Sequence, residues 1–109
     1  MNRGDLVVVS APGDYGKPRP ALIIQSDLFN ATHASVVVCL MTTDLTDAPL
    51  IRLDVEAAPE NGLKQRSQIM IDKVVALRRE RMGARIGRLD ADTLVRVNRS
   101  LALFLGLGD

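Results

Sequence analysis

The sequence predicts a mostly β protein of the β-rich α+β class, in which a small and strongly bent antiparallel barrel is followed by a C-terminal helix. Three observations support this prediction. Short runs of β-branched and aliphatic residues recur through the first 77 residues, and that composition is typical of strands. Turn-forming segments separate the runs, without the β-α-β alternation of a parallel sheet. After residue 90 the apolar residues take up helical spacing.

Length and composition set the scale of the fold. With 109 residues, the chain is predicted to form one domain over residues 1–109 with a single core. Hydrophobic residues make up 47% of the chain and charged residues 25%, and these fractions are typical of folded proteins. No apolar run approaches the roughly 20 residues of a membrane span, and the N-terminus lacks the regions of a signal peptide. We therefore expect a cytoplasmic protein without membrane association.

The first half of the chain predicts three strands. Residues 6–9 form a β-branched run, which the turn formers of residues 10–16 close. Residues 21–25 and 36–41 are apolar runs that are too short for helices and too β-branched to favour them. Between these two runs, residues 27–35 form a polar connection with room for a helical turn.

The second half predicts three more strands and one helix. Residues 50–55 and 67–72 alternate apolar with polar side chains, which is the period of a half-buried strand, and residues 74–77 indicate a sixth strand. Asp90 can cap the start of the helix, which is predicted to end near Gly106. One face of this helix carries Leu94, Val97, Leu101, Phe104 and Leu105.

Several kinds of chemistry find little support in the sequence. The chain has one histidine, one cysteine and no carboxylate cluster with ligand spacing, so we expect no metal site and no cofactor. His33 lies alone in a polar segment and has no apparent catalytic partner. Cys39 lies in an apolar run, where a free thiol behaves as a small hydrophobic core residue.

Charge is distributed unevenly along the chain. Residues 1–63 hold four Lys/Arg and eight Asp/Glu, whereas residues 64–109 hold ten and five, although the net charge is only +1. The basic second half could meet a polyanion, either nucleic acid or an acidic partner protein; the alternative is a solvated helix face. Aromatic residues make up 3% of the chain, so a platform that stacks bases on rings is not expected.

The strongest candidate for chemistry is Arg19. Pro18 and Pro20 flank it, which fixes φ at about −65° at both prolines and favours extended backbone before each. A guanidinium on so stiff a segment is pre-organised for phosphate, because its planar fork can donate two hydrogen bonds to one anion and keeps its charge at any ordinary pH. The alternative is a surface ion pair at the start of a strand.

Thr42 and Thr43 follow the predicted strand 36–41, at the point where the apolar run ends. Together with an arginine, a threonine can bind a phosphodiester, stabilise the extra charge of a pentacoordinate transition state and orient a ribose 2′-hydroxyl for in-line attack. That chemistry needs no metal. The alternative is a polar cap on the loop that follows the strand.

Taken in order, these segments resemble the MazF/PemK/Kid family of toxins from type II toxin–antitoxin modules. The resemblance covers nearly the whole chain, and it depends on the order and spacing of several short segments. They are Arg3-Gly4-Asp5-Leu6-Val7, residues 19–27 in the place of the family's RPalVvqnd, Asn30, Leu40-Met41-Thr42-Thr43 in the place of its PLTS, residues 67–74, Arg81-Met82 and Ile86-Gly87-Arg88-Leu89.

The resemblance implies an SH3-like barrel of the CcdB/PemK type that forms a homodimer. It implies sequence-selective, metal-independent cleavage of single-stranded RNA to a 2′,3′-cyclic phosphate and a 5′-hydroxyl, which inhibits translation and growth. It also implies a cognate antitoxin whose acidic tail covers the RNA site, with operator DNA bound only through that antitoxin. Arg19 and Thr42 fall where the family has its catalytic arginine and threonine.

Four further residues are expected to bind RNA: Tyr15, Lys17, Thr43 and Asp72. Asp72 matches an acidic position that one branch of the family uses for acid–base work or for holding the RNA-binding loop; the alternative is ordinary strand polarity. The chain departs from the family in two places. Its loop over residues 12–17 is short and contains no glutamate, so the cut sequence does not transfer. Met70 stands where one branch has a catalytic arginine, which favours the arginine–threonine mechanism.

Two other functions compete with the endoribonuclease. A gyrase poison resembling CcdB would share the fold, but such proteins need a Trp-Gly-Ile terminus, whereas this chain has no tryptophan and ends Gly106-Leu107-Gly108-Asp109. A catalytically silent barrel that only binds antitoxin is the second alternative, and Met70 keeps it open. The presence of both Arg19 and Thr42 favours the enzyme.

Overall fold

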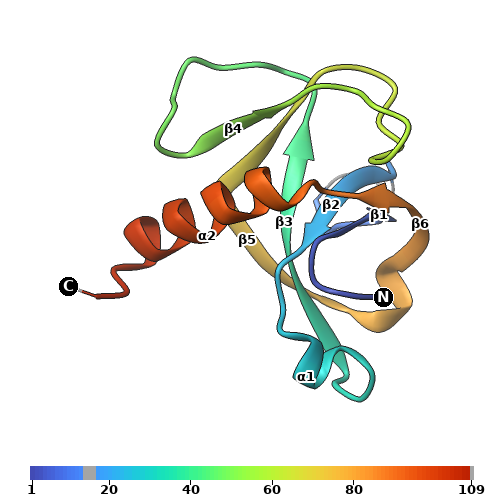
Figure 1. Ribbon diagram of the computed structural model, residues 1–109. Coiled ribbons are helices and arrows are strands. Elements are labelled where there is room, and N and C mark those ends of the chain that lie inside the picture. The colour runs from blue at the N-terminus through green and yellow to red at the C-terminus, as the bar shows by residue number, and fades with distance from the viewer. Residues whose placement is uncertain (14–16, 109) are drawn as a thin grey trace.

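The computed structural model, which describes residues 1–13 and 17–108, contains a six-stranded antiparallel sheet in the order β4-β5-β3-β2-β1-β6, followed by the helix α2 (Figure 1). The elements are β1 (Asp5–Val9), β2 (Arg19–Ile23), α1 (Asp27–Asn30), β3 (Ser35–Thr42), β4 (Arg52–Val55), β5 (Ser67–Arg78), the 3-10 turn η1 (Arg79–Arg81), β6 (Met82–Arg88) and α2 (Ala91–Leu105). The predicted mostly β class and the C-terminal helix are confirmed.

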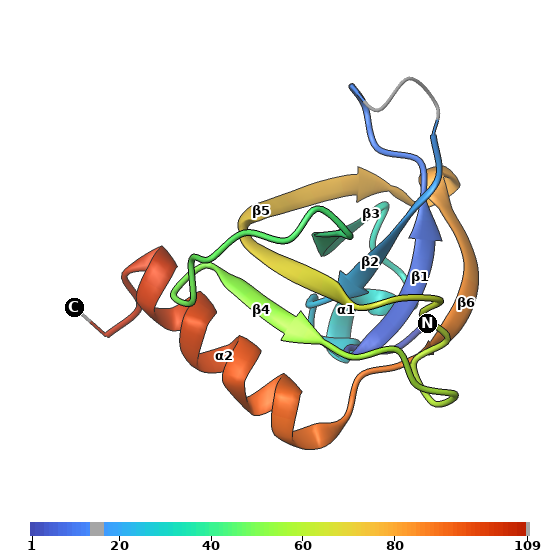
Figure 2. The same ribbon diagram turned by 90° about the horizontal axis from the view of Figure 1, so that it is seen from above.

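The sheet is strongly bent, and Figure 2 shows it curling round when seen from above. The register shifts within the β1–β6 pair and, between Cys39 and Met41, within the β3–β5 pair. Such irregularities bend a strand and increase its twist. The bend gives the sheet two buried faces, so that Leu6 packs in one apolar cluster and its neighbour Val7 in another. This explains why residues 6–9 read as a continuous apolar run rather than an alternating one.

The structure differs from the predicted strands in two places. The segments 67–72 and 74–77 are one strand of 12 residues, because β5 continues through the exposed Lys73 and pairs with both β3 and β4. Strand β6 was not predicted at all. Its position depends on close backbone approach: a Cβ at Gly83 would lie 2.8 Å from the carbonyl oxygen of Val8, and glycine avoids that clash.

Cys39 lies in the core, as predicted, and its side chain is fully buried. Burial raises the pKa of this thiol to about 12. A thiol with so high a pKa holds almost no thiolate at neutral pH and is therefore unreactive. The polar connection between β2 and β3 contains the expected helical turn, which is the four-residue helix α1.

Helix α2 begins and ends where the sequence predicts. The side chain of Asp90 accepts a hydrogen bond of 3.0 Å from the backbone N–H of Thr93, and Gly106 ends the helix with φ at 73°. Val97 and Leu101 are buried against the sheet. Phe104, expected on the same face, is 48% exposed because the last turns run out beyond the sheet (Figure 1). Within the described residues, neither α-helix is long and apolar enough to cross a membrane.

The Asp90 cap yields a stability prediction. Asp90→Ala should lower the free energy of unfolding by about 1 kcal/mol, because the first turn of α2 loses a hydrogen-bond acceptor. Hydrogen bonds from the side chain and the backbone of Thr93 lower the pKa of Asp90. The carboxylate therefore stabilises the fold fully above its unfolded pKa of about 3.9, and this contribution is lost as the pH falls through the lower folded value.

Urea unfolding of wild type, Asp90→Ala and Asp90→Ser at pH 7 and at pH 2.5 measures this contribution. Asp90→Ser should stay close to wild type at pH 7, because serine also caps helices well. The gap between wild type and Asp90→Ala should narrow at the lower pH. A gap of the same size at both pH values would show that the charge of Asp90 is not involved.

Candidate functional site

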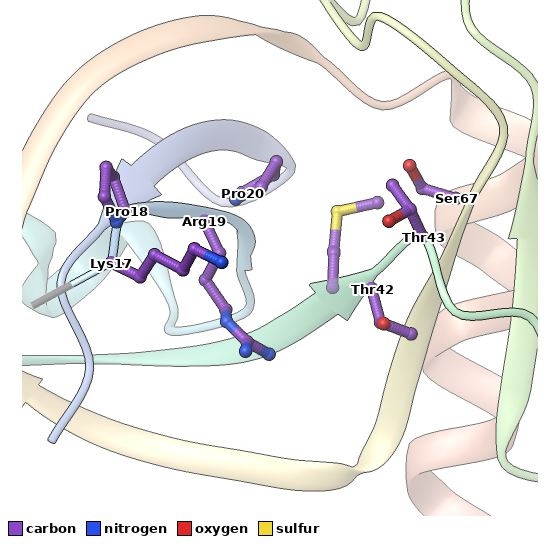
Figure 3. Close-up of a pocket in the computed structure, with 8 residues that line it drawn as sticks. Lys17, Pro18, Arg19, Pro20, Thr42, Thr43 and Ser67 are labelled. Atoms are coloured by element: carbon purple, nitrogen blue, oxygen red, sulfur yellow. The ribbon is translucent and has the colours of Figure 1, made fainter. Parts of the chain in front are cut away.

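A pocket of about 230 Å³ opens where β2 begins and β3 ends. Figure 3 shows the side chains of Lys17 and Arg19 on one side of it and those of Thr42, Thr43 and Ser67 on the other. Pro18, Pro20 and Met41 complete the lining. We call this the Arg19–Thr42 pocket. It brings together four of the six residues predicted for the site, namely Lys17, Arg19, Thr42 and Thr43.

Strand pairing explains why Arg19 and Thr42 meet. Strands β2 and β3 are antiparallel, and Ala21 lies opposite Leu40. A step of two residues toward the start of β2 and the end of β3 reaches Arg19 and Thr42, and residues two apart on a strand share a face. On its other side Arg19 pairs with Val9 of β1. The half-buried arginine is thus held within the sheet rather than on a free loop.

The backbone that follows Thr42 fixes its hydroxyl. The Oγ1 atom accepts a hydrogen bond of 3.0 Å from the backbone N–H of Asp44. A hydroxyl that accepts one bond can still donate its own hydrogen. The Thr42 hydroxyl is therefore oriented by the protein and retains a hydrogen to donate to a bound anion.

Gln68 anchors the loop that follows Thr42. It lies opposite Thr42 on β5 and is buried. Its Oε1 atom accepts from the N–H of Thr46 at 3.0 Å, and its Nε2 atom donates to the Thr46 carbonyl at 2.9 Å. The same Nε2 donates at 2.8 Å to Asp54, which in turn accepts from Arg66 at 2.6 Å. These hydrogen bonds, from Gln68 first and then from Arg66, lower the pKa of Asp54.

The sequence did not identify Gln68 as part of the site. Its partners Thr46 and Asp54 lie 22 and 14 residues away along the chain. In the sequence, Gln68 is only a polar residue next to Ser67 at the start of an alternating strand, and such a residue normally faces solvent. Only the strand pairing shows that Gln68 faces the loop of Thr42.

The two remaining predicted site residues lie elsewhere or outside the described chain. Asp72 does not line the Arg19–Thr42 pocket; it is half-buried on β5 and forms an ion pair with Arg52 of β4. Arg52 lies opposite Met70, so the guanidinium beside Asp72 comes from the neighbouring strand. Contact of Asp72 with RNA stays a prediction. Tyr15 lies outside the described residues.

The charges of the Arg19–Thr42 pocket favour an anion. Its two charged lining residues are Lys17 and Arg19, and among the described residues that line it there is no acidic side chain. Two cations and the hydroxyls of Thr42 and Thr43 around one small cavity suit a phosphate group. Elsewhere in the described ranges, 1–13 and 17–108, no three His, Cys, Asp or Glu side chains are grouped as a metal site would need.

Comparison with known proteins gives consistent results. Residues 2–105 match the family described as PemK-like, MazF-like toxin of type II toxin–antitoxin system. A protein of Mycolicibacterium smegmatis named probable endoribonuclease MazF is 50% identical over 108 residues, which are 98% of each chain. Endoribonuclease EndoA of Bacillus subtilis is 26% identical over 116 aligned residues, covering 100% of this chain and 97% of its own.

Solved structures show the same fold. An endoribonuclease from a mycobacterial species, determined in complex with its cognate antitoxin, is 25% identical and aligns with a TM-score of 0.80 over 100% of this chain and 98% of its own. The Mycobacterium tuberculosis toxin MazF-mt6 is 22% identical, with a TM-score of 0.83 over 96% of this chain and 99% of its own. The predicted fold family is therefore confirmed for this chain.

Proposed function

Because the chain belongs to the PemK-like, MazF-like toxins of type II toxin–antitoxin systems, we propose that it is the toxin of such a system and acts as an endoribonuclease. The observation that carries the proposal is the pocket that gathers Arg19, Lys17 and the hydroxyls of Thr42 and Thr43. Two relatives that cover nearly the whole chain are named endoribonucleases. The substrate that we propose is single-stranded RNA.

We propose a transesterification at the Arg19–Thr42 pocket. The ribose 2′-oxygen attacks the adjacent phosphorus, the bond from phosphorus to the 5′-oxygen breaks, and a 2′,3′-cyclic phosphate forms. The proton of the 2′-hydroxyl is released and the 5′-oxygen gains one, so the second product ends in a 5′-hydroxyl. Arg19 donates two hydrogen bonds to the phosphate and balances its extra negative charge in the transition state, which is the task a metal ion would otherwise perform.

The other proposed site residues hold the RNA strand on either side of the cut. Thr42 donates its hydroxyl hydrogen to the same phosphate, while Lys17 and Thr43, both exposed at the pocket, bind the neighbouring backbone. Tyr15 and Asp72 remain proposed RNA contacts. Asp72 on β5 is paired with Arg52, and it would contact the RNA strand beyond the Arg19–Thr42 pocket rather than inside it.

A cognate antitoxin is the proposed regulator. An acidic antitoxin tail would find in the Arg19–Thr42 pocket the cations that bind RNA phosphate, and it would therefore compete with the substrate. A mycobacterial endoribonuclease has been solved in complex with its cognate antitoxin, which supports an antitoxin partner by analogy. We propose that operator DNA is bound only through the antitoxin, and that the protein acts in the cytoplasm.

We also propose a homodimer, supported by the far end of α2. Leu50, Leu103 and Phe104 are 67%, 63% and 48% exposed, and together with Ile51 they surround an apolar hollow of about 240 Å³. Large exposed apolar side chains that cluster on one surface usually mark a protein–protein contact.

The substrate class can be tested with three forms of one sequence: single-stranded RNA, the same RNA annealed to its complement, and single-stranded DNA. We expect cleavage of the single-stranded RNA alone, because the reaction needs a 2′-hydroxyl and a strand that can enter the pocket. Cleavage of the DNA would contradict the proposed reaction. Failure to cut any RNA, combined with inhibition of gyrase supercoiling, would favour the CcdB-like alternative.

The anchoring of the Thr42 loop yields a further prediction. Gln68→Ala should lower kcat by about tenfold and change KM little, because a loosened loop misplaces the hydroxyl of Thr42 in the transition state. Gln25→Ala is a matched control, since Gln25 also clamps backbone with hydrogen bonds to Ser35 and Val37, but at the other end of β3. The control should lose stability and keep its kcat. Equal losses of kcat in both variants would reduce Gln68 to a structural role.

A further inference from the structure

A second pocket adjoins the Arg19–Thr42 pocket and has a volume of about 350 Å³. The two pockets share three lining residues, Pro20, Thr43 and Ser67. A cavity of this size is within the range that holds small organic ligands, about 300–1,000 Å³. The remaining walls of the second pocket are Val8, Gly62, Leu63, Lys64, Gln65 and Ile86.

The second pocket differs from the first in its chemistry. Val8, Leu63 and Ile86 give it aliphatic walls, whereas Lys64 and Gln65 are exposed polar residues of its lining. Such a cavity suits a flat, largely apolar group that carries hydrogen-bonding atoms along its edge. It suits a phosphate less well than the Arg19–Thr42 pocket does, because the aliphatic side chains in its lining offer an anion no partner and it contains no arginine.

The wall that faces β6 is rigid. Gly62 has φ at 71°, and a Cβ there would lie 2.0 Å from the carbonyl oxygen of Ile86, so only glycine fits. Asn61 is buried, and its Oδ1 accepts from the N–H groups of Ala58 and Leu63 at 3.1 and 2.9 Å. The second pocket is therefore held open in advance, which lowers the cost of binding a ligand of matching shape.

Along a nucleic acid strand, every phosphate has a base attached within one nucleotide on either side. A phosphate bound by Arg19 and Thr42 therefore brings a neighbouring base close to the shared wall of Pro20, Thr43 and Ser67. We infer that the second pocket receives one nucleobase next to the scissile phosphate and that Lys64 and Gln65 recognise its edge. This inference rests on the proposed endoribonuclease function.

A pocket of this kind lets a chain with few aromatic residues select a base. Phe29 lies on α1 and Phe104 at the end of α2, and neither lines this pocket. The base is held between aliphatic side chains rather than stacked on a ring. Lys64 offers only donors and Gln65 offers both donors and an acceptor, so together they can distinguish bases by the pattern of groups on the edge.

The test compares the base preference around the cut in four proteins: wild type, the Lys64→Ala/Gln65→Ala double variant, Val8→Phe and Arg99→Ala as control. Each cuts the same pool of randomised RNA, and the fragment ends are sequenced. At one position beside the cut, the preference of the double variant for the favoured base over the others should fall by about tenfold. A loss of this size is typical when a contact to a base edge is removed. Arg99 lies exposed on α2, so its variant should keep the wild-type pattern.

Val8→Phe is an independent test, because the phenylalanine ring is larger than the valine side chain and should fill the second pocket without touching the polar residues. The Val8→Phe protein should cleave the preferred RNA about tenfold more slowly than wild type. It should cleave an RNA that is abasic at that position at the same rate as wild type cleaves that abasic RNA. Unchanged preference in the double variant, or a loss that is equal on normal and abasic RNA in Val8→Phe, would overturn the inference while leaving the ribonuclease in place. A wild-type protein that cuts no RNA would instead overturn the proposed function.

Discussion

Arg19→Ala is expected to lower the rate of RNA cleavage by about 10³-fold or more, because it removes the guanidinium that balances the charge of the transition state. The stability of the fold should change little, since Arg19 is only half-buried and lies at the start of β2. Single-turnover cleavage of a labelled RNA measures the effect. Expression of the variant in cells should no longer arrest growth.

Two further variants separate the charge of Arg19 from its shape. Arg99→Ala removes the same charge from the exposed face of α2 and should cleave at the wild-type rate. Arg19→Lys keeps the charge but loses the fork that binds two phosphate oxygens, so it should remain well below wild type. An Arg19→Ala protein that cleaves RNA at near the wild-type rate, or still arrests growth, would remove Arg19 from the mechanism.

Thr42→Val is expected to lower kcat by about 10²-fold, because it keeps the shape of the side chain and removes the hydroxyl. The effect should fall on kcat more than on KM if the hydroxyl bonds the phosphate more strongly in the transition state than in the ground state. Steady-state kinetics with one short RNA that contains a single cut site would measure both constants.

Thr42→Ser is the matched variant, because serine keeps a hydroxyl that can accept from the Asp44 N–H as Thr42 does. It should retain activity within a few fold of wild type. Equal rates for Thr42 and Thr42→Val would mean that the residue only closes the turn after β3, which was the alternative that the sequence left open.

Much of the fold was predictable because its signals are local. The β-branched runs of β1, β2 and β3 and the cap of α2 at Asp90 are visible within a few residues of sequence. Strand β6 was not predictable in this way. Gly83 and Gly87 weaken its strand signal, and both are needed because other backbone segments, at Val8 and at Asn61, pass within contact distance.

The candidate site shows the same difference between residues with a local signal and residues that depend on long-range contacts. Arg19 could be found because two prolines stand beside it, and Thr42 because an apolar run ends there. The surroundings of these residues depend on contacts between distant segments. Gln68 reaches Thr46 across 22 residues and Asp72 reaches Arg52 across 20, and no local pattern indicates either pair.

The second pocket shows the same limitation more clearly. The walls that it does not share with the Arg19–Thr42 pocket come from β1, β6 and the loop before β5, and none of these segments carries a binding motif in the sequence. The pocket exists because the bent sheet brings Val8 and Ile86 beside the loop of Gly62, whose contact with Ile86 tolerates no side chain. A cavity of this kind depends on how the strands pair, and the pairing cannot be read from a single sequence.

The most direct test of the account is incubation of wild type and Arg19→Ala with a long RNA of mixed sequence in the presence of EDTA, followed by mapping of every cut and its end groups. We expect wild type to make discrete cuts that leave 5′-hydroxyl and 2′,3′-cyclic phosphate ends, and the variant to make none. Cuts that leave 5′-phosphates, cuts that EDTA suppresses, or equal cleavage by the two proteins would contradict this expectation.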